Sequence, residues 1–210
     1  MTRRITAVPL LLCIALLSAC AAPIAEEVVH YEFLSVEYDS AQQLYSRADA
    51  VVEGVVIGST VERIDLGVPA FEGEDPVRNP YAGVEGEPNE LDTTIVFTVY
   101  QVEIVNARTG RYQRGDVVDV RLAGGELDGV TYVSEASPTL TRGSTYAFFL
   151  HDLSAGSAEP LNPTQSVYRR SAAGGFQSAT QGNALARDIT GDLAREFPPT
   201  RPGSPEPPTH

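Results

Sequence analysis

The sequence predicts a mainly β domain whose strands curl into a single small, closed or partly open antiparallel barrel. The longest β-rich run, residues 93–106, carries alternating apolar side chains from Ile95 to Val99, which is typical of a half-buried strand. The next large hydrophobes, Val102 and Ile104, are one position out of step with this alternation. The slip predicts a β-bulge or a sharp coil near Tyr100–Gln101, and bulged strands allow a small sheet to close.

Four other segments have the length and composition of strands: 50–57, 117–122, 130–133 and 146–150. Gly54, in the middle of the first, predicts a bulge or a close backbone approach. Asp128-Gly129 is typical of a hairpin turn before the third. The last, YAFFL, is an unbroken apolar run, so we expect it to be buried on both faces. Short strands are also expected at 167–168 and at 176.

A short helix is expected before the first of these strands and a weak one after the last. Ser40 and Gln43 have the spacing of a capping box, which predicts a helix that begins at Ser40 and ends at Arg47–Asp49. Large apolar residues fall four apart between Leu185 and Leu193, as they do along one face of a helix.

The N-terminus has the features of an export signal. Arg3 and Arg4 precede an apolar stretch, Pro9–Leu17, that is too short to span a bilayer. The ending Leu17-Ser18-Ala19-Cys20 resembles the lipobox of bacterial lipoproteins. That resemblance implies that Cys20 receives a diacylglycerol and anchors the protein to the cell membrane, on the extracytoplasmic face, at the cell surface or in the periplasm. The alternative is an ordinary secretory signal cleaved at an Ala-x-Ala-like site, with Cys20 incidental.

The predicted elements divide the chain into parts. Residues 63–92 are rich in acids, glycine and proline and lack apolar periodicity, so they are expected to be a loop without a core. The expected parts are a signal peptide at 1–19, a tether at 20–38, a β-barrel domain at 39–182 with an acidic loop insertion at 63–92, a helix at 183–196 and a proline-rich disordered tail at 197–210.

Composition excludes several classes of function. The two cysteines are Cys13, in the leader, and Cys20, so the mature chain has no intrachain disulfide, no Cys-ligated zinc site and no cysteine nucleophile. The formal net charge is −13, or −15 without the two leader arginines. Such an acidic chain is a poor partner for nucleic acid, because phosphate contacts need clustered basic side chains.

Four segments together resemble a known domain: ADAVVEGVVIG, TTIVFTVYQVEIVNA, GDVVDVRLAGGELDGV and TRGSTYAFFL. They are similar to the OB-like β-barrel of many uncharacterised bacterial secreted proteins and lipoproteins over residues 40–180, including the motif G-x-x-Y-x-x-F-L, here Gly143, Tyr146, Phe149 and Leu150. The resemblance implies the fold and the extracytoplasmic address, and it brings no catalytic residues. A fainter likeness to the netrin-like barrel of tissue inhibitors of metalloproteinases implies a protease-inhibitor-like module, although the inhibitors' disulfides and free N-terminal cysteine are missing here.

Two groups of residues are candidates for chemistry. His151 and Asp152 follow the YAFFL run and could act as a base with its orienting carboxylate. The alternative is a solvated histidine at a strand end. Asp49, Glu53 and the acids of the 65–92 loop could gather around Ca²⁺, but they lack the spacing of a calcium-binding loop, and the alternative is a solvated acidic loop.

The primary functional hypothesis is a non-enzymatic, lipid-anchored module that binds an envelope protein or a small ligand outside the membrane. One face of an OB barrel often binds ligands, and six tyrosines could contribute an aromatic patch to it: Tyr31, Tyr38, Tyr45, Tyr81, Tyr112 and Tyr168. The alternative is an envelope hydrolase that uses His151 and nearby carboxylates, which needs a pocket that contains His151 and a nucleophile or metal. The sequence predicts no cofactor, no metal site and no nucleic-acid partner.

Overall fold

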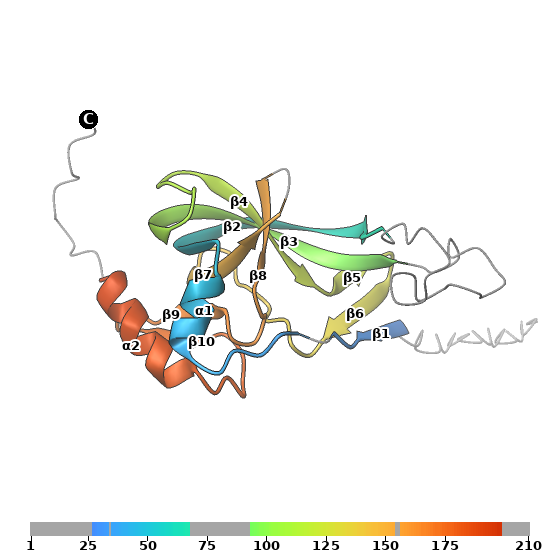
Figure 1. The fold of residues 1–210 in the computed structure, drawn as a ribbon. Helices are drawn as coiled ribbons and strands as arrows, with labels where there is room; N and C mark the ends of the chain where they lie inside the picture. Colours follow the sequence, from blue (N-terminus) through green and yellow to red (C-terminus); the bar gives the residue numbers. More distant parts are fainter. Residues whose placement is uncertain (1–26, 34, 68–92, 154–155, 199–210) are drawn as a thin grey trace, which may run out of the picture.

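The computed structural model describes residues 27–33, 35–67, 93–153 and 156–198, and this part of the chain is mainly β (Figure 1). The leader, Cys20, most of the acidic loop and the end of the tail lie outside the described residues. The elements in chain order are β1 (Glu27–Tyr31), α1 (Ala41–Arg47), β2 (Ala50–Asp65), β3 (Thr94–Thr109), β4 (Val117–Ala123), β5 (Gly125–Leu127), β6 (Val130–Ser134), β7 (Thr145–Asp152), β8 (Ser157–Pro160), β9 (Val167–Arg170), β10 (Phe176–Ser178) and α2 (Ala186–Glu196).

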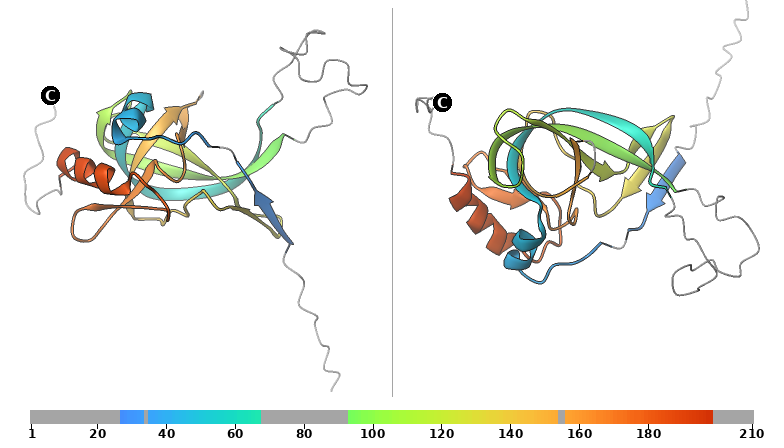
Figure 2. Two further views of the ribbon diagram at one scale, coloured as in Figure 1. Left: turned by 60° about the horizontal axis from the view of Figure 1, so that its bottom comes forward. Right: turned by 45° about the horizontal axis from the view of Figure 1, so that its top comes forward.

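Two sheets contain these strands. The smaller has the order β1-β6-β5, and the larger has the order β10-β9-β7-β2-β3-β4-β8. β8 also pairs with β7, so the succession of pairings β2–β3–β4–β8–β7 returns to β2. All of these pairings are antiparallel except β4–β8, which is parallel. Figure 2 shows how strongly the long strands β2 and β3 bend along this path.

The irregularity expected near Tyr100–Gln101 lies in the neighbouring strand β2 instead. β3 pairs with β4 in unbroken register from Phe97 to Glu103, so the prediction of a bulge near Tyr100–Gln101 is wrong for this strand. The pairing of β2 with β3 has three register shifts, and one of them lies between Val56 and Gly58, opposite Val102 and Gln101. The extra residue at this shift is Ile57 of β2, whereas the other two shifts have their extra residues, Val105 and Arg108, in β3.

The change of apolar phase in β3 has a different cause from a bulge. Val96 and Tyr100 face one side of the strand and Phe97 and Val99 the other, and all four are buried. After Gln101, only the side of Val102 remains covered, because Gln101 is exposed. The apparent slip in the sequence thus marks the place where a strand covered on both faces becomes covered on one.

Apolar side chains form two clusters on opposite faces of β7. Tyr146, Phe148 and Leu150 join one cluster with side chains of β2, β3 and β4. Ala147 and Phe149 join the other, with side chains of α1, β9, β10 and α2. The expectation that residues 146–150 are buried on both faces is confirmed. Figure 1 shows α1 and α2 on the side of β9 and β10, away from the small sheet.

Local signals explain where several elements begin and end. Ser40 caps α1, since its Oγ accepts a hydrogen bond from the Gln43 N–H at 3.2 Å. Gln43 Oε1 accepts one in return from the Asp39 N–H, 2.9 Å away, rather than from the Ser40 amide. Asp128 and Gly129 both have positive φ, 55° and 80°, which suits the two-residue turn between β5 and β6.

The boundaries expected at the two ends need correction. Residues 27–31 were expected to be tether, but they form β1 and pair in parallel with β6, where the pattern Glu-Val-Val-His-Tyr was too short to identify. The tail was expected to start at residue 197, but Phe197 is only 2% exposed and its carbonyl accepts a hydrogen bond from Arg170. Residues 186–197 therefore belong to the folded body. No described helix has the length and apolar character needed to cross a membrane.

Candidate functional site: an apolar cavity outside β3 and β4

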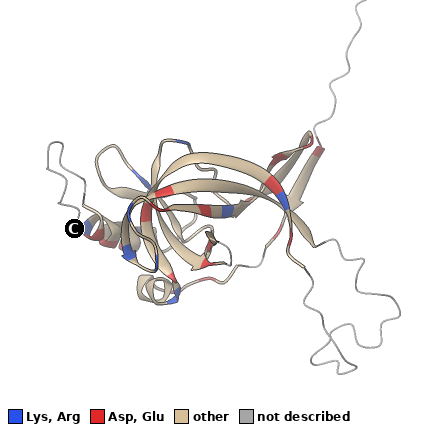
Figure 3. Ribbon diagram, turned by 90° about the horizontal axis from the view of Figure 1, so that it is seen from above, with Lys and Arg blue, Asp and Glu red and all other residues tan. Residues whose placement is uncertain are grey.

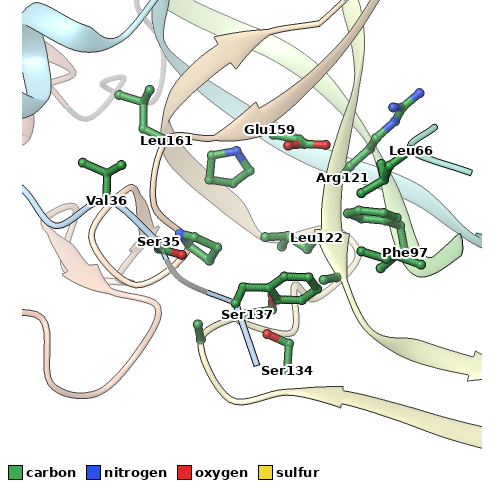
Figure 4. Close-up of a pocket in the computed structure, with 16 residues that line it drawn as sticks. Ser35, Val36, Leu66, Phe97, Arg121, Leu122, Ser134, Ser137, Glu159 and Leu161 are labelled. Carbon is green, nitrogen blue, oxygen red and sulfur yellow. The ribbon is translucent and has the colours of Figure 1, made fainter. Parts of the chain in front are cut away.

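A cavity of about 360 Å³ lies against the outer side of β3 and β4 (Figure 4). Its walls come from the chain segment around Phe33 and Val36, the turn that follows β6 at 134–137, and residues 159–163 at the end of β8. We call it the outer cavity. Its size lies within the range of small-molecule sites.

Strand register explains which side chains line this cavity. Phe97 pairs with Ala123 and Val99 with Arg121, and side chains of directly paired residues point to the same face of a sheet. That face is the one opposite to Tyr100 and the inner cluster. The parallel pairing of β4 with β8 then brings Glu159 beside β4.

Exposed apolar side chains gather at the border of the outer cavity. Phe33 is 41% exposed, Val36 67% and Leu66 53%, and all three line it. They are three of the five large hydrophobic side chains that are exposed in the described part of the chain. Clustered exposure of this kind marks binding sites more often than single exposed residues do.

The polar groups of the outer cavity have unused hydrogen-bonding capacity. Arg121 donates from Nη2 to Ser157 Oγ at 3.1 Å, while its Nε is buried without a partner. Ser137 Oγ is also buried without a partner. Of the three such side-chain atoms in the described residues, only Tyr45 Oη lies elsewhere. Buried polar atoms are normally paired, so these two atoms are exceptions among the residues that line the cavity.

Glu159 supplies a half-buried carboxyl to the same wall. Burial raises the pKa of this carboxyl above its usual value, and the positive charges of Arg121 and His151 only partly oppose the shift. Among the described residues, no hydrogen bond or ion pair of this carboxylate is found. Figure 4 shows Glu159 and Arg121 on one side of the cavity and Ser134 and Ser137 on the other.

The histidine pair expected from the sequence is arranged differently. His151 Nδ1 lies 2.7 Å from Asp49 Oδ2, and the Asp152 N–H donates to the same oxygen at 3.0 Å. The Asp152 N–H and then the His151 ring lower the pKa of the Asp49 carboxyl. The carboxylate of Asp152 instead accepts a hydrogen bond from Tyr112 Oη at 2.6 Å. Asp152 is therefore not the orienting carboxylate, and the His151 side chain is 57% exposed.

The acidic residues considered for Ca²⁺ are not brought together. Glu53 is 3% exposed and forms an ion pair with Arg170, and it accepts a hydrogen bond from Asn106 Nδ2 at 2.6 Å. The Asp49 carboxylate is within hydrogen-bonding distance of the His151 ring. In the residues that the structure describes, no three His, Cys, Asp or Glu side chains could hold a metal ion. Most of the acidic loop lies outside them.

The six tyrosines do not form one aromatic patch. Tyr38 and Tyr168 are buried in the cluster under the helices, and Tyr81 lies outside the described residues. Tyr31 stacks on Tyr132, with ring centroids 5.7 Å apart, and also contacts Phe33 at 5.5 Å. The aromatic side chains at the cavity are thus Phe33 and Phe97, which were not among the residues expected to form the patch.

Charged side chains are dispersed over the strands, and Figure 3 shows arginines and acids interspersed rather than gathered on one face. Arg121 and Glu159 are the charged residues that line the outer cavity. Neither residue has a local signal in the sequence, since an outward arginine in an alternating strand is ordinary and Glu159 falls in a segment without periodicity.

Comparisons of the chain with protein-family models, with curated proteins and with solved structures found no match.

Proposed function

We propose that this protein is a lipid-anchored, extracytoplasmic binding module that holds a ligand in the outer cavity of an OB-like barrel. One observation carries the proposal: three of the five exposed large apolar side chains of the described part border this single cavity. Exposed apolar surface costs free energy in water, about 25 cal/mol per Å². Its concentration at one concave site favours a ligand-binding role over a purely structural one.

The strand pairing supports the OB-like part of the proposal. An OB fold is a five-stranded, partly open barrel whose second and third strands form the ligand-binding face. Here five strands pair in succession and return to the first, and one of the pairings is parallel. β3 and β4 are the second and third strands of that succession, and the outer cavity lies on them.

The lipobox-like ending at Cys20 supports the anchor. We expect Cys20→Ala to abolish the incorporation of labelled palmitate and the partitioning of the protein into a detergent phase, because the acyl chains supply the membrane affinity. A variant that labels as well as the parent would show that Cys20 is incidental.

A tryptophan reporter tests the cavity. The chain contains no tryptophan, so Phe33→Trp places a single reporter at the border of the outer cavity. We expect saturable quenching of its fluorescence by ω-brominated ten-carbon amphiphiles. Adding Ala123→Phe, which fills the cavity, should weaken this quenching.

The matched control for that experiment is Gln181→Trp, an exposed site away from the outer cavity. Its fluorescence should respond only to non-specific contact with the amphiphile. If none of the amphiphiles quenches Phe33→Trp more than Gln181→Trp, the outer cavity is not a binding site.

The envelope-hydrolase hypothesis gains a carboxylate partner for His151, Asp49, but the described residues bring no nucleophile to this pair. The described hydrogen bond of the His151 ring is to Asp49, and it involves no serine or threonine hydroxyl. His151 is also absent from the walls of the outer cavity.

A further inference from the structure

The outer cavity places one basic and one acidic side chain on the same wall. Arg121 and Glu159 line it together, and the positive charge of Arg121 partly opposes the rise in the pKa of Glu159 that burial causes. The rest of the wall is mainly apolar, with Ile95, Phe97 and Leu161 among its members. The site thus combines an apolar body with a polar side of no net charge.

We propose that the outer cavity binds a small uncharged amphiphile, with its apolar chain against Phe97 and Leu161 and a head group, a primary amide or a hydroxyl, between Arg121 and Glu159. This inference rests on the proposed binding function of the cavity and specifies its ligand class.

The volume limits the size of the ligand. At roughly 30 Å³ for each water molecule in the liquid, 360 Å³ accommodates about a dozen non-hydrogen atoms. A single chain of about ten carbons with a small head has this size. The exposed Phe33, Val36 and Leu66 at the border extend the apolar surface along which the chain enters.

The two charged side chains have complementary requirements. The Arg121 guanidinium has five N–H donors, and its described hydrogen bond is the single one to Ser157. The Glu159 carboxylate can only accept when ionised, and it has no partner in the described part. A head that accepts from Arg121 and donates to Glu159 satisfies both groups at once.

A charged head group is repelled by one of the two side chains, whatever the sign of its charge. A carboxylate or phosphate that pairs with Arg121 approaches the like charge of Glu159, and an ammonium that pairs with Glu159 approaches Arg121. Unpaired or repelled charges in a partly desolvated site cost more than hydrogen bonds gain. An amide or hydroxyl avoids this cost because it is neutral and carries both a donor and an acceptor.

The test uses three ligands with the same chain and different heads. The full chain with Phe33→Trp, reconstituted in phosphatidylcholine nanodiscs at pH 8, far above the usual carboxyl range, is titrated with ω-bromodecanamide, ω-bromodecanoate and ω-bromodecylamine. We expect the amide to bind about tenfold more tightly than either charged ligand, the difference that one hydrogen bond to a charged group makes.

Two charge-changing variants turn the preference in opposite directions. In the Phe33→Trp background, Glu159→Gln leaves Arg121 as the charged side chain of the cavity wall, and ω-bromodecanoate should then become the tightest ligand. Arg121→Gln leaves Glu159 as the charged side chain of the cavity wall, and ω-bromodecylamine should then become the tightest ligand. A gain of affinity for a charged ligand cannot arise from misfolding, so both variants remain informative even if one of them is less stable.

The outcomes separate this inference from the proposed function. If all three ligands quench the reporter equally in the parent and in both variants, the cavity binds apolar chains but the head does not contact Arg121 and Glu159, and the inference is wrong. If decanoate or decylamine is preferred by the parent, the ligand class is wrong. If no ligand quenches beyond the Gln181→Trp control, the binding function itself fails.

Discussion

The two outer faces of the strands are covered in different ways. On the face of β7, β9 and β10, the helices α1 and α2 contribute Leu44, Ile189 and Leu193, all fully buried. On the face of β3, β4 and β8, the cover is irregular chain near Val36, the turn at 134–137 and residues 159–163. The first face is filled, and the second keeps a cavity of about 360 Å³.

The difference follows from what each kind of cover can do. A helix repeats its apolar side chains every three or four residues, so that a stripe fits continuously onto a sheet. Irregular segments have no such repeat, and loops rich in serine and proline leave space and unpaired polar atoms. The helical face therefore stabilises the protein, while the irregularly covered face has space for a ligand. Five substitutions test this division.

The largest loss of stability is expected on the helical face. Phe149 is fully buried and its ring meets those of Tyr45 and Tyr168, with centroids 4.7 and 6.1 Å away. Phe149→Ala should lower the free energy of unfolding by ~3–5 kcal/mol, the range for deleting a buried aromatic ring. Urea denaturation measures this loss. A cost near 1 kcal/mol would mean that the helical face is loosely packed.

The same substitution on the cavity face should cost less. Phe97 is 7% exposed and forms a wall of the outer cavity, so Phe97→Ala enlarges an existing space that solvent can enter. We expect a loss of about 1.5–3 kcal/mol, the transfer free energy of the side chain without an added cavity cost. Equal urea midpoints for Phe97→Ala and Phe149→Ala would remove the distinction between the two faces.

Glu159→Gln should stabilise the protein at neutral pH. Because the pKa of Glu159 is raised in the folded chain, its contribution favours folding below the unfolded pKa and is lost as the pH rises through the folded pKa. Replacing the carboxyl with an amide removes this loss, so the urea midpoint should rise at pH 7 and the gain should vanish near pH ~4.

The size of this gain is limited by solvent. Glu159 is only half-buried, so screening keeps the effect well under ~1 kcal/mol. Glu126→Gln, at an exposed position of β5, is the matched control and should show no comparable dependence on pH. A gain for Glu159→Gln that persists at pH ~4 would point to a cause other than the charge.

The smallest effect on stability is expected at the border of the cavity. Val36→Ser and Leu66→Ser replace side chains that are more than half exposed, so each should change the free energy of unfolding by less than ~0.5 kcal/mol. Both should nevertheless weaken quenching of the Phe33→Trp reporter by ω-bromodecanamide. If binding is unchanged, the exposed apolar border does not contribute to the site.

The parts of the fold that the sequence predicts are those with local causes. The Ser40 cap, the turn at Asp128-Gly129 and the doubly buried run at 146–150 depend on neighbouring residues. The phase change in β3 was visible too, but its cause was not. The sequence pattern does not distinguish an apolar residue that faces the inner cluster from one that faces the segments covering the outer side of the sheet.

The candidate site could not be predicted because it depends on distant partners. Glu159 and Arg121 line the same cavity because β4 pairs in parallel with β8, and no turn or spacing in the sequence indicates that register. His151 similarly takes its carboxylate from Asp49, 102 positions earlier, instead of from its neighbour Asp152. Long-range strand pairing decides both arrangements, whereas composition and periodicity report only local preference.

The pairing of β2 with β7 also has a consequence for the order of folding. Ala50 pairs with Leu150, 100 positions later, so one edge of β2 stays without its neighbour until most of the chain has emerged. Contacts so far apart in sequence form slowly, since the chain must first lose the entropy of closing a long loop. An incomplete chain therefore has an unpaired edge on β2, and such edges promote aggregation. Such late completion would suit a protein that crosses a membrane before it folds, as the lipobox-like leader implies.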